Sequence, residues 1–462
     1  MIPDPVLAHA LVGREDLPIP AWLFAWGASL VLIVSFAVLS FAWKSTRLQE
    51  EDWRPAPALL SRLLLNPVVE VVCGVVSVGL LALVVYSGLE GTLDRNFNFS
   101  VTFVFVTFWL GMVAASVLFG DVFRALNPWR ALARAFSAGF RLVAGQSSPP
   151  PLRLPERLGC WPAVILLVGF VWLELAYSTG VEPDDTAIAA LVYTAVTLVG
   201  MALFGIDAWT ERGEAFSVYF RMFARLSVLE VREGRLGVRR FLSGAPNWEV
   251  LPGSPALVLV TIAATSFDGA QEGALGTPIT DTFDWVRDAG LSGVTAFRVT
   301  NSIWLALVIG AVVLLYTLGV RGMHTVAGSP PARELARSFA HTLIPIALAY
   351  LVAHYFSLVV FQEQAQFTYL LSDPLGDGSN ILGTADCPAA CIDYGLISAN
   401  LVWYVQVAAL VIGHVAALTL AHDRAIAVYD DYAKASRSQY FMLAVMVAFT
   451  CLGLYLLSQA NA

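Results

Sequence analysis

Ten apolar stretches, each about 20 residues long, recur along this 462-residue chain, and none of them contains Lys or Arg. They span residues 21–43, 67–89, 99–119, 161–177, 186–209, 250–267, 302–320, 338–361, 397–420 and 440–457. A helix of this length crosses the hydrocarbon core of a bilayer with its backbone hydrogen bonds satisfied internally. The chain is also 58% hydrophobic and only 13% charged. The sequence therefore predicts an all-α integral membrane protein with about ten transmembrane helices.

The basic residues between these stretches predict how the helices are oriented. Of the 27 Lys and Arg residues, 23 fall in the connections after the first, third, fifth, seventh and ninth stretches. Basic residues accumulate in the cytoplasmic loops of membrane proteins. We therefore expect both termini on the outer side, an N-out/C-out topology. Lys44 and Lys434 are the only lysines, a composition that favours a bacterial protein of the plasma (inner) membrane.

The connections divide a single polytopic domain, residues 1–462, into four parts. These are an outer tail (1–20), spans one to five (21–209), a cytoplasmic amphipathic loop (210–249) and spans six to ten (250–462). The last part includes two long Gly-rich outer connections, 268–301 and 362–396. Long connections are usually lids or binding loops, so we expect these two to cover the outer face.

Two Arg-rich segments are predicted to form interfacial amphipathic helices on the cytoplasmic side. The first follows the third span and alternates Arg130 and Arg134 with Trp129 and Phe136. The second, residues 213–241, has four aromatic residues at helical spacing that are expected to face the membrane: Phe216, Tyr219, Phe220 and Phe223. Such helices suit the lipid bilayer surface and anionic lipid headgroups. We do not expect nucleic-acid binding.

Three ionisable residues fall at one depth in the outer part of the spans. Glu174 lies near the outer end of the fourth span, Asp268 closes the sixth, and His354 lies in the eighth. A charge at the centre of a bilayer costs about 2.5 to 3.5 kcal/mol, so such residues mark functional sites by default. The alternative is that each one separately bonds a neighbouring backbone or hydroxyl group.

Folding of the outer tail over these spans would add His9 to the same site. Imidazole and carboxylate groups suit a divalent metal such as zinc or copper. In this hypothesis His354 and His9 bind the metal, and Asp268 and Glu174 are catalytic residues.

A second set of polar candidates lies in the inner part of the spans: Asp207, His341, His414, His422 and Glu70. His414 and His422 are eight residues apart, roughly 12 Å along a helix, which is too far for them to share one ion. Glu70 is expected to pair with another member of this set. Acid and His residues are the usual material of proton relays, so a connection between the inner and outer sets would form a proton path.

Cys387 and Cys391 lie close together in the second long outer connection. An oxidising outer compartment favours a disulfide between them. Free thiols and a metal site are the alternatives.

Several stretches together resemble a family of bacterial membrane proteins labelled fenitrothion hydrolase. They are AHALVGREDLPIPAWLFAW, ALNPWRAL, WLEL, GEAFSVYF, MFARL, TSFDG, AHTLIPIALAYLVAHYFSLVVFQ, SDPLG, WYVQVAALVIGHVAALTLAHDRA and RSQYFMLAVMV. The resemblance covers nearly the whole chain and implies a membrane-bound hydrolase of organophosphate esters. The AHA around His9 is also similar to a copper-binding stretch of periplasmic copper-resistance proteins.

Three functions follow as hypotheses. The first is a metal-assisted hydrolase with an outward-facing site, the second is a transporter or metal-handling permease, and the third is an accessory subunit of a membrane complex. A P-loop, a GxSxG elbow, a CxxCH haem motif and an HExxH motif are all absent from the sequence, which argues against an ATP-driven pump and a standard serine hydrolase. Polar residues across both leaflets would favour transport, whereas a polar cluster in the outer leaflet alone would favour an enzyme.

Overall fold

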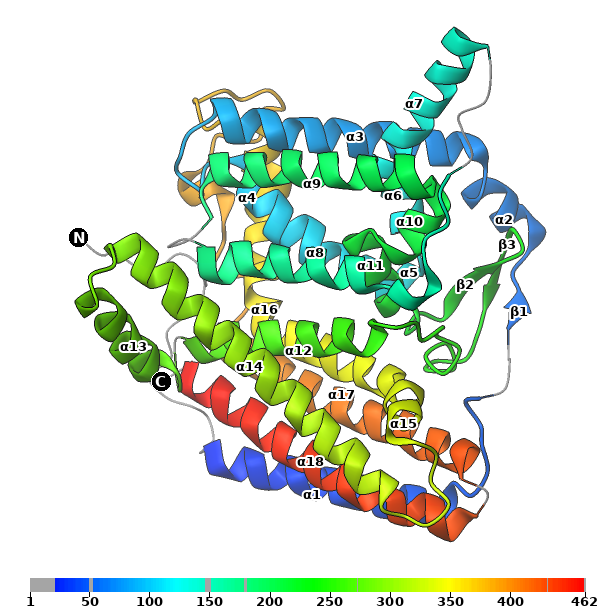
Figure 1. Cartoon of the computed structure of the whole chain (residues 1–462). Coiled ribbons are helices and arrows are strands. Elements are labelled where there is room, and N and C mark those ends of the chain that lie inside the picture. Colours follow the sequence, from blue (N-terminus) through cyan, green and yellow to red (C-terminus); the bar gives the residue numbers. More distant parts are fainter. Residues whose placement is uncertain are drawn as a thin grey trace.

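The computed structural model describes residues 21–49, 53–145, 151–177, 181–271, 273–429 and 431–460. These residues form an all-α integral membrane protein with one small sheet (Figure 1). The predicted fold class is therefore confirmed. The outer tail, residues 1–20 with His9, lies outside the described residues.

The first half of the chain contains α1 (Ala21–Ala42), β1 (Arg54–Pro55), α2 (Ala58–Leu64), α3 (Pro67–Glu90), α4 (Phe99–Thr102), η2 (Phe103–Gly111), α5 (Met112–Phe119), α6 (Phe123–Leu126), α7 (Pro128–Ala144), η3 (Glu156–Leu158), α8 (Trp161–Trp172), η4 (Leu173–Tyr177), α9 (Pro183–Phe204), α10 (Ile206–Arg212), α11 (Ala215–Ala224), β2 (Leu229–Arg232) and β3 (Arg235–Val238). The second half contains α12 (Ser254–Gln271), α13 (Gly276–Asp288), α14 (Gly293–His324), α15 (Ala332–Ser338), η5 (Ala340–Leu343), α16 (Ile344–Ala365), η6 (Gln366–Leu370), η7 (Pro388–Cys391), α17 (Ala399–Val428) and α18 (Tyr432–Ala460). Of the η segments, η2, η4 and η6 are π-helical and the others are 3₁₀ turns.

Eight helical stretches within the described residues are long and apolar enough to cross a membrane. They correspond to eight of the ten predicted spans. The two other predicted spans coincide with α1, of which Trp26–Ala42 is a shorter apolar helix, and with the 18-residue α12. The helices thus lie where the apolar stretches predict them.

The connections gather at two opposite ends of the helical bundle. In Figure 1, α7, α10 and the β2–β3 hairpin lie at one end, whereas α13 and the connection between η6 and α17 lie at the other. We call these the hairpin end and the disulfide end. The hairpin end collects the Arg-rich connections that are predicted to be cytoplasmic, so the chain alternates between two ends as the charge pattern requires.

The central helix of the bundle is α12. Thirteen of its 18 residues are buried, including the consecutive Leu257, Val258, Leu259 and Val260. A helix that is apolar on all sides must be surrounded by protein or lipid. It packs against α8, α14, α16 and α18, and this environment places Asp268, near its C-terminal end, inside the protein.

The closest packing in this half of the protein joins α16 to α17. A Cβ atom on Gly413 would lie 2.3 Å from the Ala349 Cβ and 2.8 Å from the Pro345 carbonyl oxygen. Small residues allow such close approach between membrane helices, which associate through packing rather than through the hydrophobic effect. Gly413 therefore fixes the separation of α16, which carries His354, from α17, which carries His414 and His422.

The predicted membrane-facing role of the second Arg-rich segment is wrong. Its aromatic residues are buried on α11: Phe216 is 4% exposed, Tyr219 1%, and Phe220 and Phe223 0%. Phe220 makes an edge-to-face contact with Phe123, and Phe216 makes one with Phe170, in the main hydrophobic core. The segment is not an interfacial helix, because the surrounding spans α5 and α8 enclose it on the apolar side.

The rest of that segment forms the β2–β3 hairpin rather than an amphipathic loop. Strands β2 and β3 pair antiparallel around a turn at Glu233 and Gly234, which both have positive φ, and β1 joins the other edge of β3. Glu230 of β2 contacts Arg225 at 3.2 Å and Arg239 at 2.9 Å. The arginines of this segment are thus partly engaged in ion pairs within the protein.

In contrast, α7 has the surface predicted for an interfacial helix. Phe136, Phe140, Leu142 and Val143 are exposed on it, and it projects from the hairpin end in Figure 1. Its contact with anionic lipid stays a prediction.

One long outer connection also differs from expectation. Residues 268–301 do not form a loop, because α12 continues to Gln271, α13 follows, and α14 begins at Gly293.

Candidate functional site

Asp268 is the centre of a buried polar cluster near the disulfide end of α12. The residue is 4% exposed. Its Oδ2 atom accepts a hydrogen bond from the Tyr355 hydroxyl at 2.6 Å and lies 2.9 Å from Nε2 of His354. The two partners are adjacent residues of α16, so a single helix presents an imidazole and a phenol to one carboxylate oxygen.

The residue after Asp268 is shaped to accommodate the His354 ring. A Cβ atom at Gly269 would lie 3.3 Å from Nδ1 and 3.5 Å from Cε1 of His354. The 3.3 Å separation is shorter than an ordinary van der Waals contact, so the side chain of any larger residue would press on the imidazole. Asp268 thus supplies the carboxylate, and Gly269 supplies the space for the ring of its partner, His354.

Glu174 brings a second carboxylate to this cluster. It belongs to the π-helical segment η4, at the end of α8, and it interacts electrostatically with Asp268. Its Oε2 atom is buried and has no hydrogen-bond partner among the described residues. A π-helical turn widens a helix by one residue and occurs frequently at functional sites.

Aromatic residues close the cluster on the side of α11. Tyr219 interacts electrostatically with Glu174, and its hydroxyl oxygen accepts a hydrogen bond from Trp109 Nε1 at 3.1 Å. Trp109 lies in η2, a second π-helical segment, and its ring centroid is 5.7 Å from that of Tyr355. Five segments of the chain, η2, η4, α11, α12 and α16, therefore meet around the two carboxylates.

The structure thus brings together three of the four residues predicted for the outer site, Glu174, Asp268 and His354. Sequence reasoning missed Tyr355, Tyr219 and Trp109. Tyr355 could have been found because it follows His354 directly. The other two are aromatic residues in apolar segments and carry no local signal that separates them from packing residues.

The predicted zinc or copper site stays a prediction, because His9, one of its two proposed ligands, lies outside the described residues. A metal ligand nitrogen and a carboxylate oxygen each lie about 2.0 to 2.2 Å from the ion. Here Nε2 of His354 lies 2.9 Å from Asp268 Oδ2, a distance at which the two atoms share a hydrogen bond. Within the described residues there is also no group of three or more His, Cys, Asp or Glu side chains that would hold a metal.

No family model, curated protein or solved structure matches this chain.

The structure does not gather the inner polar candidates into one site. His422 and Asp423 of α17 instead hold the segment that follows α1. His422 Nε2 is 2.9 Å from the Trp43 carbonyl oxygen. Asp423 accepts hydrogen bonds from Trp43 Nε1 (2.9 Å) and the Arg47 amide (2.6 Å), and also from the Leu48 amide and the Gln49 side chain. Through these contacts His422 and Asp423 tie α17 to the segment after α1, which is a structural role.

Glu70 and Asp207 have basic partners at the hairpin end. Glu70 lies 2.5 Å from both Arg130 and Arg134, and Asp207 lies 3.6 Å from Arg130. Glu70 is thus linked to the inner candidate Asp207 through Arg130, which contacts both carboxylates. The reason is that the first turn of α3 packs against α7, which carries both arginines.

His414 and His341 are buried at separate places along α17 and η5. His414 Nδ1 lies 2.7 Å from the Leu410 carbonyl oxygen of its own helix. The Nε2 atoms of both residues are buried and have no hydrogen-bond partner among the described residues. His414 remains a candidate residue, located beside Tyr350 of α16.

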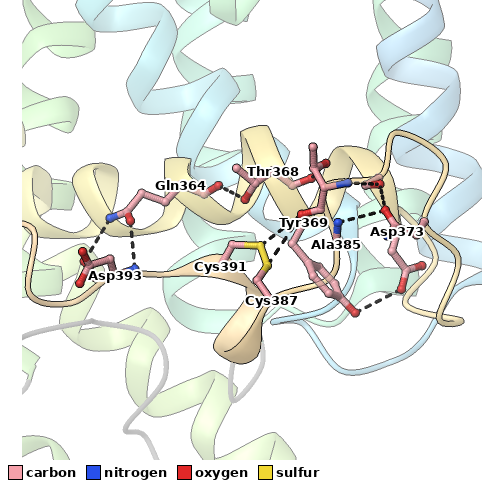
Figure 2. The surroundings of a disulfide bond; sticks show 11 residues. Gln364, Thr368, Tyr369, Asp373, Ala385, Cys387, Cys391 and Asp393 are labelled. Carbon is pink, nitrogen blue, oxygen red and sulfur yellow. Dashed lines mark hydrogen bonds between the residues drawn. A yellow bond between two sulfur atoms is a disulfide. The ribbon is translucent and has the colours of Figure 1, made fainter.

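The predicted disulfide is confirmed, since Cys387 and Cys391 are bonded in η7 (Figure 2). Nearby, the buried Asp373 accepts hydrogen bonds from the amides of Asp377 and Gly378 and from the Ser379 hydroxyl. These bonds fold the connection back onto the end of α16, so this part of the disulfide end is an ordered cover.

A cavity of about 350 Å³ lies at the hairpin end of the same helices. Its wall includes Cys160, directly before α8, and Ser254, the first residue of α12. Glu174 and Asp268 are each 14 residues further along these helices, which corresponds to about 21 Å of helix. The buried cluster and the cavity thus lie toward opposite ends of α8 and α12.

Proposed function

We propose that this protein is a proton-coupled membrane transporter in which Asp268, His354 and Tyr355 form the proton-binding site. The observation that carries the proposal is the bonding of Asp268, whose two described hydrogen-bond partners are both titratable side chains. A proton can reside on the carboxylate or on the imidazole, and the 2.9 Å separation allows it to pass between them. Ionisable residues within membrane spans commonly serve such relays.

Glu174 extends the site because it is a second buried carboxylate beside the first. Two neighbouring carboxylates resist simultaneous ionisation, so one of them retains a proton more readily than an isolated group would. In the proposed cycle this shared proton is bound when the site faces one side of the membrane and released when it faces the other. The two π-helical segments that hold Glu174 and Trp109 widen the spans locally at the site, a feature that is frequent at functional sites.

Polar features toward both ends of α8 and α12 favour transport over a purely outer-leaflet enzyme. The proton-binding site lies toward the disulfide end, and the cavity lies at the hairpin end. Tyr219 and Val218 are consecutive residues of α11. Tyr219 contacts the cluster, and Val218 lines the cavity.

Infrared difference spectroscopy of the reconstituted full-length protein tests the proton site. We expect the carbonyl band of a protonated carboxyl group to change as the pH is varied. Asp268→Asn should remove or displace that band. Glu363→Gln is the matched control, since Glu363 is a partly buried carboxylate on α16 that bonds Thr107 instead of the cluster. A band that persists in Asp268→Asn but disappears in Glu363→Gln would reject the proposed site.

A membrane-bound organophosphate hydrolase is the second candidate function. The contact between His354 and Asp268 is also the arrangement in which a carboxylate orients the imidazole of a general base. The test is hydrolysis of fenitrothion by the purified protein, followed through release of the nitrophenol product. Turnover that is present in the wild type and lost in His354→Gln would favour the enzyme over the transporter.

A further inference from the structure

The cavity at the hairpin end is lined by charged residues whose signs are separated by depth. Its arginines are Arg124, Arg130, Arg212, Arg221 and Arg225, and its acidic residues are Asp121, Asp207, Glu211 and Glu249. All four acidic residues are exposed, whereas every arginine except Arg124 is buried or half-buried. The less exposed part of the wall is therefore mainly basic, although Asp121 lies 3.6 Å from Arg221 and Asp207 lies 3.6 Å from Arg130.

The buried arginines are held in place by the surrounding protein. Arg221 donates to the Thr210 carbonyl oxygen at 2.9 Å, and Arg225 contacts Glu230 at 3.2 Å. Arg130, which is 5% exposed, contacts Glu70 at 2.5 Å. Burial lowers the pKa of Arg225, while the charge of Glu230 raises it, but a guanidinium group stays charged in proteins. Guanidinium groups held by the surrounding protein thus line a small, partly open cavity.

One donor of this wall lacks an acceptor. The Nε atom of Arg225 is buried and has no hydrogen-bond partner among the described residues. A buried donor without a partner is costly, and an anion bound beside it would supply the missing acceptor. Hydroxyl groups of Thr210, Ser217 and Ser254 line the same cavity and provide further polar contacts.

The position of two helix N-termini adds to the positive potential of the cavity. Cys160 precedes α8 and Ser254 begins α12, and both residues line the wall. The backbone N–H groups at a helix N-terminus favour anions. Here they supplement the arginines rather than form a site by themselves.

From the cavity and its arginines, we infer that this is a binding site for a small anion that carries a phosphate group. Guanidinium groups bind phosphate oxygens through paired, charge-assisted hydrogen bonds. Two sources share this chemistry, a soluble phosphate compound and the headgroup of an anionic lipid.

Thermal unfolding of the full-length protein in nanodiscs distinguishes these sources. In neutral phosphatidylcholine discs, inorganic phosphate is titrated against chloride at equal ionic strength. In a second arm, phosphatidylglycerol replaces part of the neutral lipid and no free phosphate is added. Stabilisation in the first arm identifies a soluble anion, and stabilisation in the second arm alone identifies a lipid headgroup.

Two cavity variants and one matched control assign the effect to this site. Arg221→Gln and Arg212→Gln should weaken the apparent affinity about tenfold or more, because each removes a positive charge from the less exposed part of the cavity wall. Arg141→Gln should leave it unchanged, since Arg141 is an exposed arginine of α7 at the same end that does not line the cavity.

Arg212 is half-buried in the last turn of α10, so its variant keeps the test valid if Arg221→Gln fails to fold. The inference is overturned if neither arm stabilises the wild type, or if the cavity variants respond as Arg141→Gln does. The measurement is made at constant pH and without proton flux, so its outcome is independent of the proposed transport function.

Discussion

The protein contains two buried aspartates that each lie next to a histidine, and their surroundings differ in chemistry rather than in burial. Asp423 is 0% exposed and Asp268 is 4% exposed. Asp423 accepts hydrogen bonds from two backbone amides, an indole N–H and a side-chain amide. None of these donors titrates in the physiological range. Asp268 is bonded by an imidazole and a phenol.

This difference indicates what each aspartate does. A carboxylate held by fixed N–H donors stays ionised and ties one chain segment to another. A carboxylate held by titratable groups can exchange a proton with them. Among buried acids in membrane spans, the identity of the hydrogen-bond partners therefore separates structural residues from candidate functional residues.

The largest expected effect is on the structural aspartate. Asp423→Ala leaves four donors without an acceptor and should lower the free energy of unfolding by at least about 3 kcal/mol. Thermal unfolding in nanodiscs measures this loss. If the variant were as stable as the wild type, Asp423 would not be the anchor of the segment after α1, and the comparison would fail.

A smaller loss of stability is expected at Asp268. Asp268→Asn keeps an oxygen that accepts from Tyr355, so unfolding should become easier by only about 1 to 2 kcal/mol. Proton binding, followed by the carboxyl infrared band, should nevertheless be lost. If Asp268→Asn destabilised the protein as much as Asp423→Ala does, and the carboxyl infrared band still changed with pH, then Asp268 would be a structural residue and not the proton-binding residue.

The space beside His354 gives a more selective test. Gly269→Ala places a methyl group 3.3 Å from Nδ1 of the imidazole and should displace the ring. We expect stability to change by no more than about 1 kcal/mol, because alanine is favoured in helices, while the pH dependence of the infrared signal shifts. Gly310→Ala in α14, which meets nothing within 4 Å, is the control and should leave that pH dependence unchanged.

The smallest effect on stability is expected at Glu174. Its Oε2 atom has no hydrogen-bond partner among the described residues, so Glu174→Gln should change the free energy of unfolding by about 0.5 kcal/mol or less. Removal of its charge should still alter the titration of the Asp268 site, as measured by the same infrared band. An unchanged titration would show that the two carboxylates act independently.

Much of the fold could be predicted because it depends on local composition. The spans are encoded as uninterrupted apolar runs, and the position of the arginines indicates the alternation of the connections between two ends. The environment of each aromatic or polar residue could not be predicted in the same way. The aromatic residues of α11 have the pattern of an interfacial helix, yet α5 and α8 cover them. The π-helical form of η2 and η4 also has no signature in the sequence.

For the candidate site, the sequence by itself determined that Glu174, Asp268 and His354 share a depth, because position along a helix of known rise fixes depth in the membrane. Tertiary structure alone decided that they meet, since this depends on how the helices rotate and pack around α12. The packing also decided the hydrogen-bond partners of the two aspartates. Asp268 bonds His354 and Tyr355, and Asp423 bonds the chain after α1. Hydrogen bonds between distant helices arise only when their faces are brought together, which is why Asp268, 86 residues from His354 in the sequence, bonds a histidine, whereas Asp423, directly after His422, bonds the chain that follows α1.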